Sequence, residues 1–288
     1  MKRSPCCCFP VRATGYGNRH STHCESDWQT PVIYIIFPHR CLGKKFCKTG
    51  DFTLAKNKIK AKGVLTVGIE GTYPPYTYHD ESTDELTGYD VDIARAIAEK
   101  LGVEVEFVET KWDSIIAGLD AERYDAIINQ VGITAERQEK YDFSQPYTYT
   151  KGSLIVAEDN TEITSFEDLA GKKAAQTVTS NWAAMAESYG ATIEGTDGFS
   201  QSIELVIAGR ADATLNDDVT FFDYKKAKPD AKVKIVDTSD EVNVSGVMIR
   251  KGNEELLAAI DTALDELRAE GKLKEISEKY FGVDVSVE

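Results

Sequence analysis

The sequence lacks cysteine from Lys48 to Glu288, because all six cysteines lie within the first 50 residues. It also lacks any run of 18 consecutive apolar residues, the length that a helix needs to span a bilayer. Basic residues are scarce: 33 Lys and Arg stand against 48 Asp and Glu, giving a net charge of −15. A nucleic-acid-binding protein would present a basic surface to phosphates, which argues against that class. The hydrophobic fraction of 42% excludes general disorder. What remains is a soluble globular protein that binds a small molecule or another protein.

The first 50 residues differ in composition from the rest. They carry eight basic and two acidic residues and three of the four histidines, whereas the remainder holds 25 basic and 46 acidic residues. Zinc modules usually present paired ligands about two to four residues apart, and the cysteines and histidines here are not spaced in that way. The apolar stretch Val32–Phe37 is too short for the core of a secretory signal. We therefore predict an irregular leader of unknown role over residues 1–50, outside the folded domain.

Strands and helices alternate through the first half of the remaining chain. The residue pattern predicts a strand over Val64–Ile69, a helix over Asp90–Leu101, a strand over Val103–Phe107, a short helix around Ile115–Leu119 and a strand over Tyr124–Asn129. The long helix has apolar residues at Ile93, Ile97 and Leu101, with Gly102 at the position where a helix commonly ends. This alternation is typical of an α/β fold with mostly parallel sheets.

The pattern then restarts after an extended segment, Gly152–Ala157. It predicts a capping box at Ser165–Asp168, a strand over Lys173–Gln176, helices over Asn181–Tyr189 and from Ser200 to Ile207, a second extended segment over Val242–Arg250, and helices over Glu254–Glu270 and Lys272–Tyr280. The second series of strands and helices resembles the first, which indicates an internal repeat.

An internal sequence repeat predicts two lobes. Ile116-Ala-Gly118 and Asp125-Ala-Ile-Ile-Asn129-Gln130 correspond to Ile207-Ala-Gly209 and Asp212-Ala-Thr-Leu-Asn216-Asp217. Because ligands of open α/β sheets lie beyond the carboxyl ends of the strands, these polar endings would face one cleft. We predict one lobe from residues 51–151 with 247–288, a second from 152–246, and a hinge at the two extended segments, Gly152–Ala157 and Val242–Arg250.

Polar and aromatic residues beyond the strand ends match a free amino acid. Arg137, together with the helix starts near Thr134 and Ser180, would bind an α-carboxylate. Asp217 would bind the α-ammonium group, and Tyr73 and Trp112 would supply apolar walls. Each residue also has an ordinary structural interpretation. Arg137 would then be a solvated helix residue, Asp217 a helix cap, Tyr73 and Trp112 packing residues, and Glu70 an exposed acid.

Five segments give the chain a specific resemblance over about residues 54–282. They are Val67-Gly-Ile-Glu-Gly-Thr-Tyr-Pro-Pro-Tyr76, Gly88-Tyr-Asp-Val-Asp92, Trp112-Asp-Ser114, Ile133-Thr-Ala-Glu-Arg137 and Tyr141-Asp-Phe-Ser-Gln-Pro-Tyr147. Together they resemble the periplasmic binding proteins of polar amino-acid ABC importers. Thr110–Ser114 and Asn129–Thr134 are similar to the cystine-binding branch.

The resemblance implies a two-lobed type II binding-protein fold that closes on its ligand and delivers it to a membrane permease. It implies an extracytoplasmic monomer, without enzymatic activity, cofactor or metal, although residues 1–50 show no export signal. It assigns the α-carboxylate to Arg137 and the α-ammonium to Asp217. The remaining ligand-binding positions that it implies are Glu70, Tyr73, Trp112, Asn129, Gln130, Gly132, Thr177 and Ser180.

L-cystine is our leading hypothesis for the ligand, with Glu70 and Gln130 meeting its second amino-acid group. Glutamine, histidine and arginine are alternatives. An enzyme on the same fold, such as a dehydratase, is a second class of function, but His79 is the only histidine outside the leader and Ser-His-Asp, phosphate-loop and metal-ligand motifs are absent. The sensor domain of a kinase or channel is a third, and it would require a membrane span in the same chain.

Overall fold

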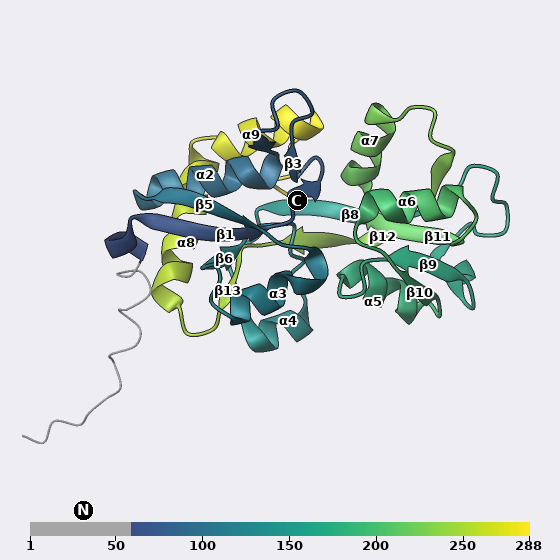
Figure 1. Cartoon of the computed structure of the whole chain (residues 1–288), viewed down its shortest axis with the longest axis horizontal. Helices are drawn as coiled ribbons and strands as arrows, with labels where there is room; N and C mark the ends of the chain where they lie inside the picture. Colours follow the sequence, from purple (N-terminus) through teal and green to yellow (C-terminus); the bar gives the residue numbers. More distant parts are fainter. Residues whose placement is uncertain (1–58) are drawn as a thin grey trace, which may run out of the picture. The chain divides into compact units, whose positions relative to one another are not determined.

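The computed structural model describes residues 59–288 (Figure 1). The predicted leader, residues 1–50, lies outside the described residues. The fold is α/β, as predicted, with two five-stranded sheets and one small three-stranded sheet. We call the elements around the first five-stranded sheet the first lobe and those around the second the second lobe. No helix in residues 59–288 is long and apolar enough to cross a membrane.

The first sheet has the strand order β5-β1-β6-β13-β7. Its strands are β1 (Val64–Ile69), β5 (Glu104–Glu109), β6 (Ala126–Ile127), β7 (Tyr141–Phe143) and β13 (Met248–Arg250). β1 pairs in parallel with β5 and β6, whereas β13 runs antiparallel to both of its neighbours. The sheet is therefore mostly parallel, with one reversed strand that returns from the second lobe.

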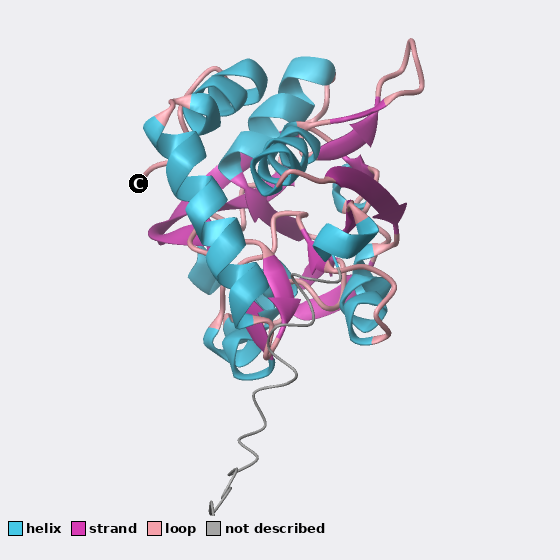
Figure 2. Cartoon of the chain, turned by 90° about the vertical axis from the view of Figure 1, so that its left-hand side faces the viewer, coloured by secondary structure: helices cyan, strands magenta, loops and turns pink. Residues whose placement is uncertain are grey.

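Alternating side chains give this sheet two apolar faces. Ala126 and Ile128 join a core with the helices α2 (Tyr89–Leu101), α8 (Glu254–Ala269) and α9 (Lys272–Phe281), whereas Ile127 joins a separate core with α3 (Trp112–Asp120). Successive side chains of a strand point to opposite faces, so one strand serves both cores. Helices accordingly lie on either side of the strands (Figure 2). The predicted stop of α2 is present, since Gly102 is left-handed with φ 71°.

Tyr124 explains two glycines of the first lobe. Its ring occupies the space beside Gly68, where an added Cβ would lie 2.5 Å from a ring carbon, and its hydroxyl fills the space beside Gly118. The hydroxyl donates a hydrogen bond to the carbonyl of Ile115. Gly118 is thus needed for close packing between α3 and β1 rather than for a turn.

The second sheet has the strand order β10-β9-β11-β8-β12. Its strands are β8 (Thr148–Ala157), β9 (Lys173–Gln176), β10 (Thr192–Gly195), β11 (Ala213–Asp217) and β12 (Val233–Ser245). Leu154 and Val156 face a core with α5 (Asn181–Ser188) and the 3-10 helix η1 (Phe166–Leu169), while Ile155 faces a core with α6 (Phe199–Ile207) and α7 (Asp218–Ala227). β8 is the reversed strand here, as β13 is in the first sheet.

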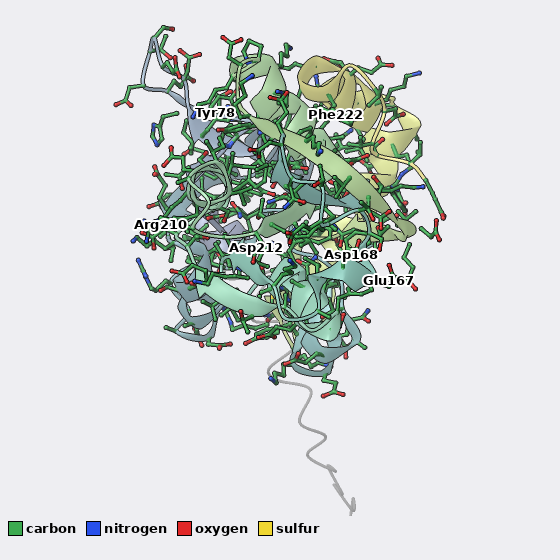
Figure 3. The ribbon with its side chains drawn as sticks, turned by 90° about the vertical axis from the view of Figure 1, so that its right-hand side faces the viewer. Tyr78, Glu167, Asp168, Arg210, Asp212 and Phe222 are labelled. Carbon is green, nitrogen blue, oxygen red and sulfur yellow. The ribbon has the colours of Figure 1, made fainter. Side chains whose placement is uncertain are left out.

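The internal sequence repeat has a structural basis at the start of the repeated strands. Asp125 accepts hydrogen bonds from the backbone N–H and the hydroxyl of Thr66, at 3.0 and 2.6 Å. Asp212, which is labelled in Figure 3, accepts one at 2.7 Å from the backbone N–H of Lys173. In each lobe the aspartate ties the start of one strand to its parallel neighbour, so the repeated aspartate has the same structural role in both.

The chain passes between the two sheets at residues 144–147, between β7 and β8, and at residues 246–247, between β12 and β13. The two crossings are bonded to each other, because Ser144 donates its N–H to the Val247 carbonyl at 3.0 Å and its hydroxyl accepts from the Val247 N–H at 2.9 Å. The prediction of a crossing at Gly152–Ala157 was wrong: that segment lies inside β8. An apolar extended run cannot by itself distinguish a linking strand from a sheet strand.

Four smaller differences from the predicted elements concern element ends, a polar helix and very short strands. The strand predicted over Tyr124–Asn129 pairs only over β6, and α6 begins at Phe199 rather than Ser200. The sequence did not indicate α7, in which only Thr220, Phe221 and Tyr224 are buried, so its apolar stripe is narrow. The small sheet was also missed, because its strands β2 (Thr72–Tyr73), β3 (Thr77–His79) and β4 (Leu86–Thr87) are two or three residues long.

Candidate functional site

A small cavity lies between the lobes where strands of both sheets end. Eight of the ten predicted ligand-binding residues line it: Glu70, Tyr73, Trp112, Asn129, Gln130, Thr177, Ser180 and Asp217. Its volume is about 50 Å³, which has room for a few water molecules. The two lobes must therefore part before an amino acid can enter.

Glu70 forms the acidic side of the cavity in the first lobe. It follows β1, and its carboxylate accepts a 2.8 Å hydrogen bond from the side-chain amide of Asn129. The Asn129 carbonyl oxygen accepts in turn from the Glu70 backbone N–H at 2.9 Å and from the Thr77 hydroxyl at 3.0 Å. Removal of the carboxylate from water raises the pKa of Glu70 to about 7, although the Asn129 bond acts in the opposite direction. Glu70 is therefore an acid whose charge is easily gained or lost near neutral pH.

Asp217 forms the acidic side in the second lobe. It ends β11 at the N-cap position of α7, yet its side chain makes no capping bond. Its Oδ1 instead accepts hydrogen bonds from the Thr150 hydroxyl and, at 3.2 Å, from the Asn243 amide. The side chain is 2% exposed, and burial raises its pKa to about 6. The helix-cap interpretation of Asp217 is thus wrong, and its partners, which lie on β8 and β12, aim it away from the helix.

Aromatic side chains of the first lobe meet the second lobe at this cavity. The Tyr73 hydroxyl donates a 2.7 Å hydrogen bond to Oδ1 of Asn216. Trp112 is the first residue of α3, and its ring lies 5.6 Å from the guanidinium carbon of Arg137. The Trp112 indole N–H is buried without a hydrogen-bond partner in the protein. The ring of Trp112 therefore lies between the cavity, which it lines, and Arg137.

Arg137 lies beside this cavity rather than in its wall. It lines an adjoining groove of about 1080 Å³, which shares Ser180, Asn181 and Trp182 with the cavity. The guanidinium donates to the carbonyl of Gly132 at 2.9 Å and, across the lobes, to the carbonyl of Thr179 at 3.2 Å. Partial burial lowers its pKa without removing its charge. Two of its five N–H groups are used in these bonds, which leaves others for an anion.

Gly132 and Gln130 are placed differently from their predicted roles. Gly132 lines neither the cavity nor the groove, and its carbonyl instead positions Arg137. Gln130 touches the cavity, but its amide donates to Asp90 at 2.7 Å and to the Thr148 hydroxyl at 3.2 Å. Its backbone has φ 50°, which directs the side chain into the first lobe. Gln130 thus connects the cavity with β8, next to a crossing between the lobes.

The 177–180 loop completes the cavity. Ser180 caps α5, because its hydroxyl accepts from the Ala183 N–H at 3.0 Å, and the same hydroxyl donates to the Thr177 carbonyl at 2.8 Å. These bonds fix the loop between β9 and α5, so that Thr177 and Ser180 both face the cavity. A polar loop that opens a helix offers free backbone N–H groups to an anion.

The cavity wall also includes residues that were not among the predicted ligand-binding positions. They are Thr72, Gln176, Asn181, Trp182, Gly198, Phe199, Ser202 and Asn216. The internal sequence repeat had indicated Asn216, since it corresponds to Asn129. Gln176 lies at the end of a predicted strand. Trp182, Phe199 and Ser202 lie within helices, where sequence alone does not separate a wall residue from a core residue.

The electrostatics of this cavity favour positively charged groups. Its wall contains two carboxylates, Glu70 and Asp217, and no Lys or Arg. Each carboxylate is held by amide or hydroxyl donors rather than by a cation. A ligand that brings two positive groups would neutralise both acids, while Arg137 and the 177–180 loop remain available for a carboxylate. Within residues 59–288, no group of three or more His, Cys, Asp or Glu residues is arranged to hold a metal ion.

The whole domain matches one protein family. The family model described as "Bacterial extracellular solute-binding proteins, family 3" covers residues 65–283. The chain belongs to this family, which confirms the resemblance and the two-lobed fold that it implies. At this level the protein is an amino-acid-binding receptor.

Two curated relatives share this range. The L-cystine-binding protein TcyA of Bacillus subtilis (strain 168) is 44% identical over 243 residues, which cover 84% of this chain and 89% of the relative. The L-cystine-binding protein TcyJ of Escherichia coli (strain K12) is 38% identical over 233 residues, which cover 80% and 87%. Both are binding proteins by name, which supports a receptor rather than an enzyme.

Solved structures indicate which conformation the two lobes adopt. The L-cystine solute receptor of Neisseria gonorrhoeae, in its unliganded open conformation, is 48% identical with a TM-score of 0.56, covering 81% of this chain and 99% of that one. An ancestral arginine-binding protein bound to arginine is only 39% identical, yet its TM-score is 0.71, covering 76% and 99%. An ancestral amino-acid-binding protein, a precursor of cyclohexadienyl dehydratase, is 34% identical with a TM-score of 0.71, covering 78% and 98%. Better agreement with the bound form at lower identity fits a closed arrangement, as do the hydrogen bonds between the lobes.

Proposed function

We propose that this protein is an extracytoplasmic receptor that binds L-cystine between its lobes and delivers it to the permease of an ABC importer. The observation that carries the proposal is the pair of carboxylates, Glu70 and Asp217, on opposite sides of one cavity with Arg137 beside it. The names of the two curated relatives supply the ligand. The receptor acts as a monomer, because one chain supplies both walls of the site.

In this proposal three of the four charged groups of cystine have a partner. Asp217 binds one α-ammonium group and Arg137 the α-carboxylate of the same amino-acid unit, with the 177–180 loop adding backbone donors. Tyr73 and Trp112 pack against the disulfide-linked stem. Glu70 meets the second α-ammonium group, supported by Asn129. Gln130 acts through Asp90 and Thr148 rather than by direct contact, and Gly132 acts by holding Arg137.

Arginine is the second candidate, because the same charges favour it. It too brings two positive groups, but it has only one carboxylate. With Glu70 ionised, Glu70, Asp217 and Arg137 carry a net charge of −1, which a net positive ligand complements. With Glu70 protonated, the three groups sum to zero, and the excess negative charge that favours arginine is lost. The charge state of Glu70 therefore bears directly on which ligand is preferred.

Isothermal titration calorimetry with cystine, cysteine, arginine, glutamine and histidine tests the proposal. We expect one cystine per chain, tighter binding of cystine than of the other four, and no turnover of any ligand on prolonged incubation. Tighter binding of arginine would contradict the ligand assignment but not the receptor function. Formation of product at a steady rate would instead favour the enzyme alternative.

A further inference from the structure

A clasp outside the cavity joins the two lobes at Thr179. The Thr179 backbone N–H and hydroxyl both donate to Oδ1 of Asp113, at 3.1 and 2.8 Å. The Thr179 carbonyl accepts from Arg137 at 3.2 Å. All three hydrogen-bonding groups of one second-lobe residue are therefore bound by two first-lobe side chains. We call Asp113, Arg137 and Thr179 the clasp.

Asp113 lies in the first turn of α3, directly after Trp112, and is exposed. It lines neither the cavity nor the adjoining groove. Asp113 therefore acts on ligand affinity through the position of Thr179 and, apart from that, through its negative charge, which helps to raise the pKa of Glu70. Thr179 lies in the same loop as Thr177 and Ser180, which do line the cavity, so the clasp fixes this part of the wall against the first lobe.

Three other side-chain bonds between the lobes illustrate how the clasp differs. Tyr73 to Asn216 lies in the cavity wall itself, Tyr76 to Thr220 spans 3.4 Å, and Lys111 to Asp197 is an exposed ion pair at 3.0 Å. Exposed ion pairs contribute little, whereas a carboxylate that accepts two hydrogen bonds from one residue has a fixed geometry. Within the clasp, the contact between Asp113 and Thr179 is thus best suited to hold the lobes together without touching the ligand.

We propose that Asp113 is a positioning residue that sets ligand affinity by stabilising the closed arrangement through Thr179. Arg137 makes the clasp responsive to ligand, because the guanidinium that contacts Thr179 is also the proposed partner of the α-carboxylate. A carboxylate that orders Arg137 strengthens the bond to Thr179, and closure is then favoured only when a ligand with this group is present. The role of Arg137 rests on the proposed function; the role of Asp113 requires only that an amino acid bind between the lobes.

The test compares Asp113→Ala, Asp113→Asn and Thr179→Val with wild type in the full chain, using whichever amino acid the wild type binds most tightly among the five named above. Asp113→Ala should weaken binding by roughly five- to thirtyfold, because two bonds to a charged but exposed acceptor are lost. The loss should appear as faster dissociation in stopped-flow measurements, with the association rate nearly unchanged. Asp113→Asn keeps an oxygen acceptor and should recover most of the affinity, whereas Thr179→Val loses one bond and should fall between.

Two controls distinguish the proposed positioning role of Asp113 from a purely structural role. The melting temperature without ligand should match wild type in Asp113→Ala, while the ligand-induced rise in melting temperature is reduced. Glu104→Ala, which removes an exposed acid of the same lobe away from the second lobe, should leave both quantities unchanged.

Three results would overturn the proposed role of the clasp, and they differ from the result that would overturn the assignment of the ligand. Wild-type affinity in Asp113→Ala would overturn it, as would a loss that comes entirely from slower association. An Asp113→Ala protein that melts early without ligand would show a folding role instead. Tightest binding of arginine would refute only the cystine assignment, whereas a wild type that binds none of the five amino acids would refute both proposals.

Discussion

At the scale of single residues, the site depends on buried charges held by neutral donors. Asp217 is aimed by Thr150 and Asn243, and Glu70 by Asn129, so each carboxylate has a fixed direction but no cation to neutralise it. Such charges are costly to bury alone, which makes the positive groups of a ligand the natural partners.

The two proposed anchors give the first prediction. Arg137→Ala and Asp217→Ala should each weaken cystine binding by about 30-fold to several thousandfold, because removal of one partner of a buried charge pair costs about 2–5 kcal/mol. Trp112→Ala should weaken binding less, and Glu70→Ala should mainly change the order of preference among cystine, arginine, glutamine and histidine. Calorimetry measures all four variants, with the exposed Asp230→Ala as the control. Wild-type affinity in Arg137→Ala would show that the carboxylate is bound elsewhere.

Asp90 gives a second prediction at this scale, on pH. Its Oδ1 accepts from Gln130 at 2.7 Å and from the Tyr147 hydroxyl at 3.0 Å, while its Oδ2 is buried without a partner. Burial raises the pKa of Asp90 to about 7. The folded protein therefore holds this proton more tightly than the unfolded chain, and the free energy of unfolding falls as pH rises from about 4 to 7.

Asp90→Asn removes this dependence, because an amide is neutral at every pH. At pH 8 the variant should be more stable than wild type by up to about 4 kcal/mol, and at pH 4 the difference should vanish. Urea denaturation at a series of pH values measures both quantities. The exposed Asp230→Asn should show no such trend. A variant that is less stable than wild type at pH 8 would contradict the raised pKa, because ionised Asp90 would then stabilise the folded protein.

At the scale of elements, the hinge consists of two short crossings that pack against each other. Gly246 lies in the second crossing, where an added Cβ would be 2.9 Å from Cδ1 of Ile133 and 3.1 Å from the carbonyl oxygen of Ser144 in the first. The glycine therefore allows the crossings to approach closely.

Gly246→Ala should destabilise the protein by about 1–3 kcal/mol, because the backbone at the crossings has to shift to admit the methyl group. Gly198→Ala is the matched control, since nothing lies within 4 Å of its added Cβ. Urea denaturation without ligand measures the difference between the two variants. Equal stabilities of Gly246→Ala and Gly198→Ala would mean that the two crossings move apart to admit the methyl group at little cost in free energy.

At the scale of the whole molecule, the closed arrangement and the small cavity together require an opening motion. We expect small-angle X-ray scattering to give a smaller radius of gyration at saturating ligand than without ligand, because a hinge rotation brings the lobes together. An unchanged radius would count against the hinge.

The predicted boundary of the leader is also a question at this scale. A chain that begins at Asp51 should bind cystine and melt like the full chain if residues 1–50 are outside the fold. Calorimetry and thermal melts compare the two. Metal-dependent melting of the full chain alone would restore the zinc interpretation of the leader.

The sequence by itself determined the elements whose signals are local. The bounds of β1 and β9 follow from short apolar runs, the end of α2 from Gly102, and the start of η1 from its capping box, in which Ser165 and Asp168 bond reciprocally. It also determined the two-lobed class, because the repeated Asp125 and Asp212 fix the same strand-to-strand bond in each lobe. These features depend on neighbours in the chain or in one lobe.

Only the tertiary structure decided what depends on residues far apart in the sequence. Asp217 was open to a capping role until Thr150 and Asn243, from two other strands, were seen to hold it. Gln130 was expected to face a ligand until Asp90, 40 residues earlier, was seen to take its amide. The role of Thr179 depends on Asp113 and Arg137, two residues of the other lobe that bind it. Hydrogen bonds between distant segments form only when the fold brings them together, so no local pattern in the sequence specifies them.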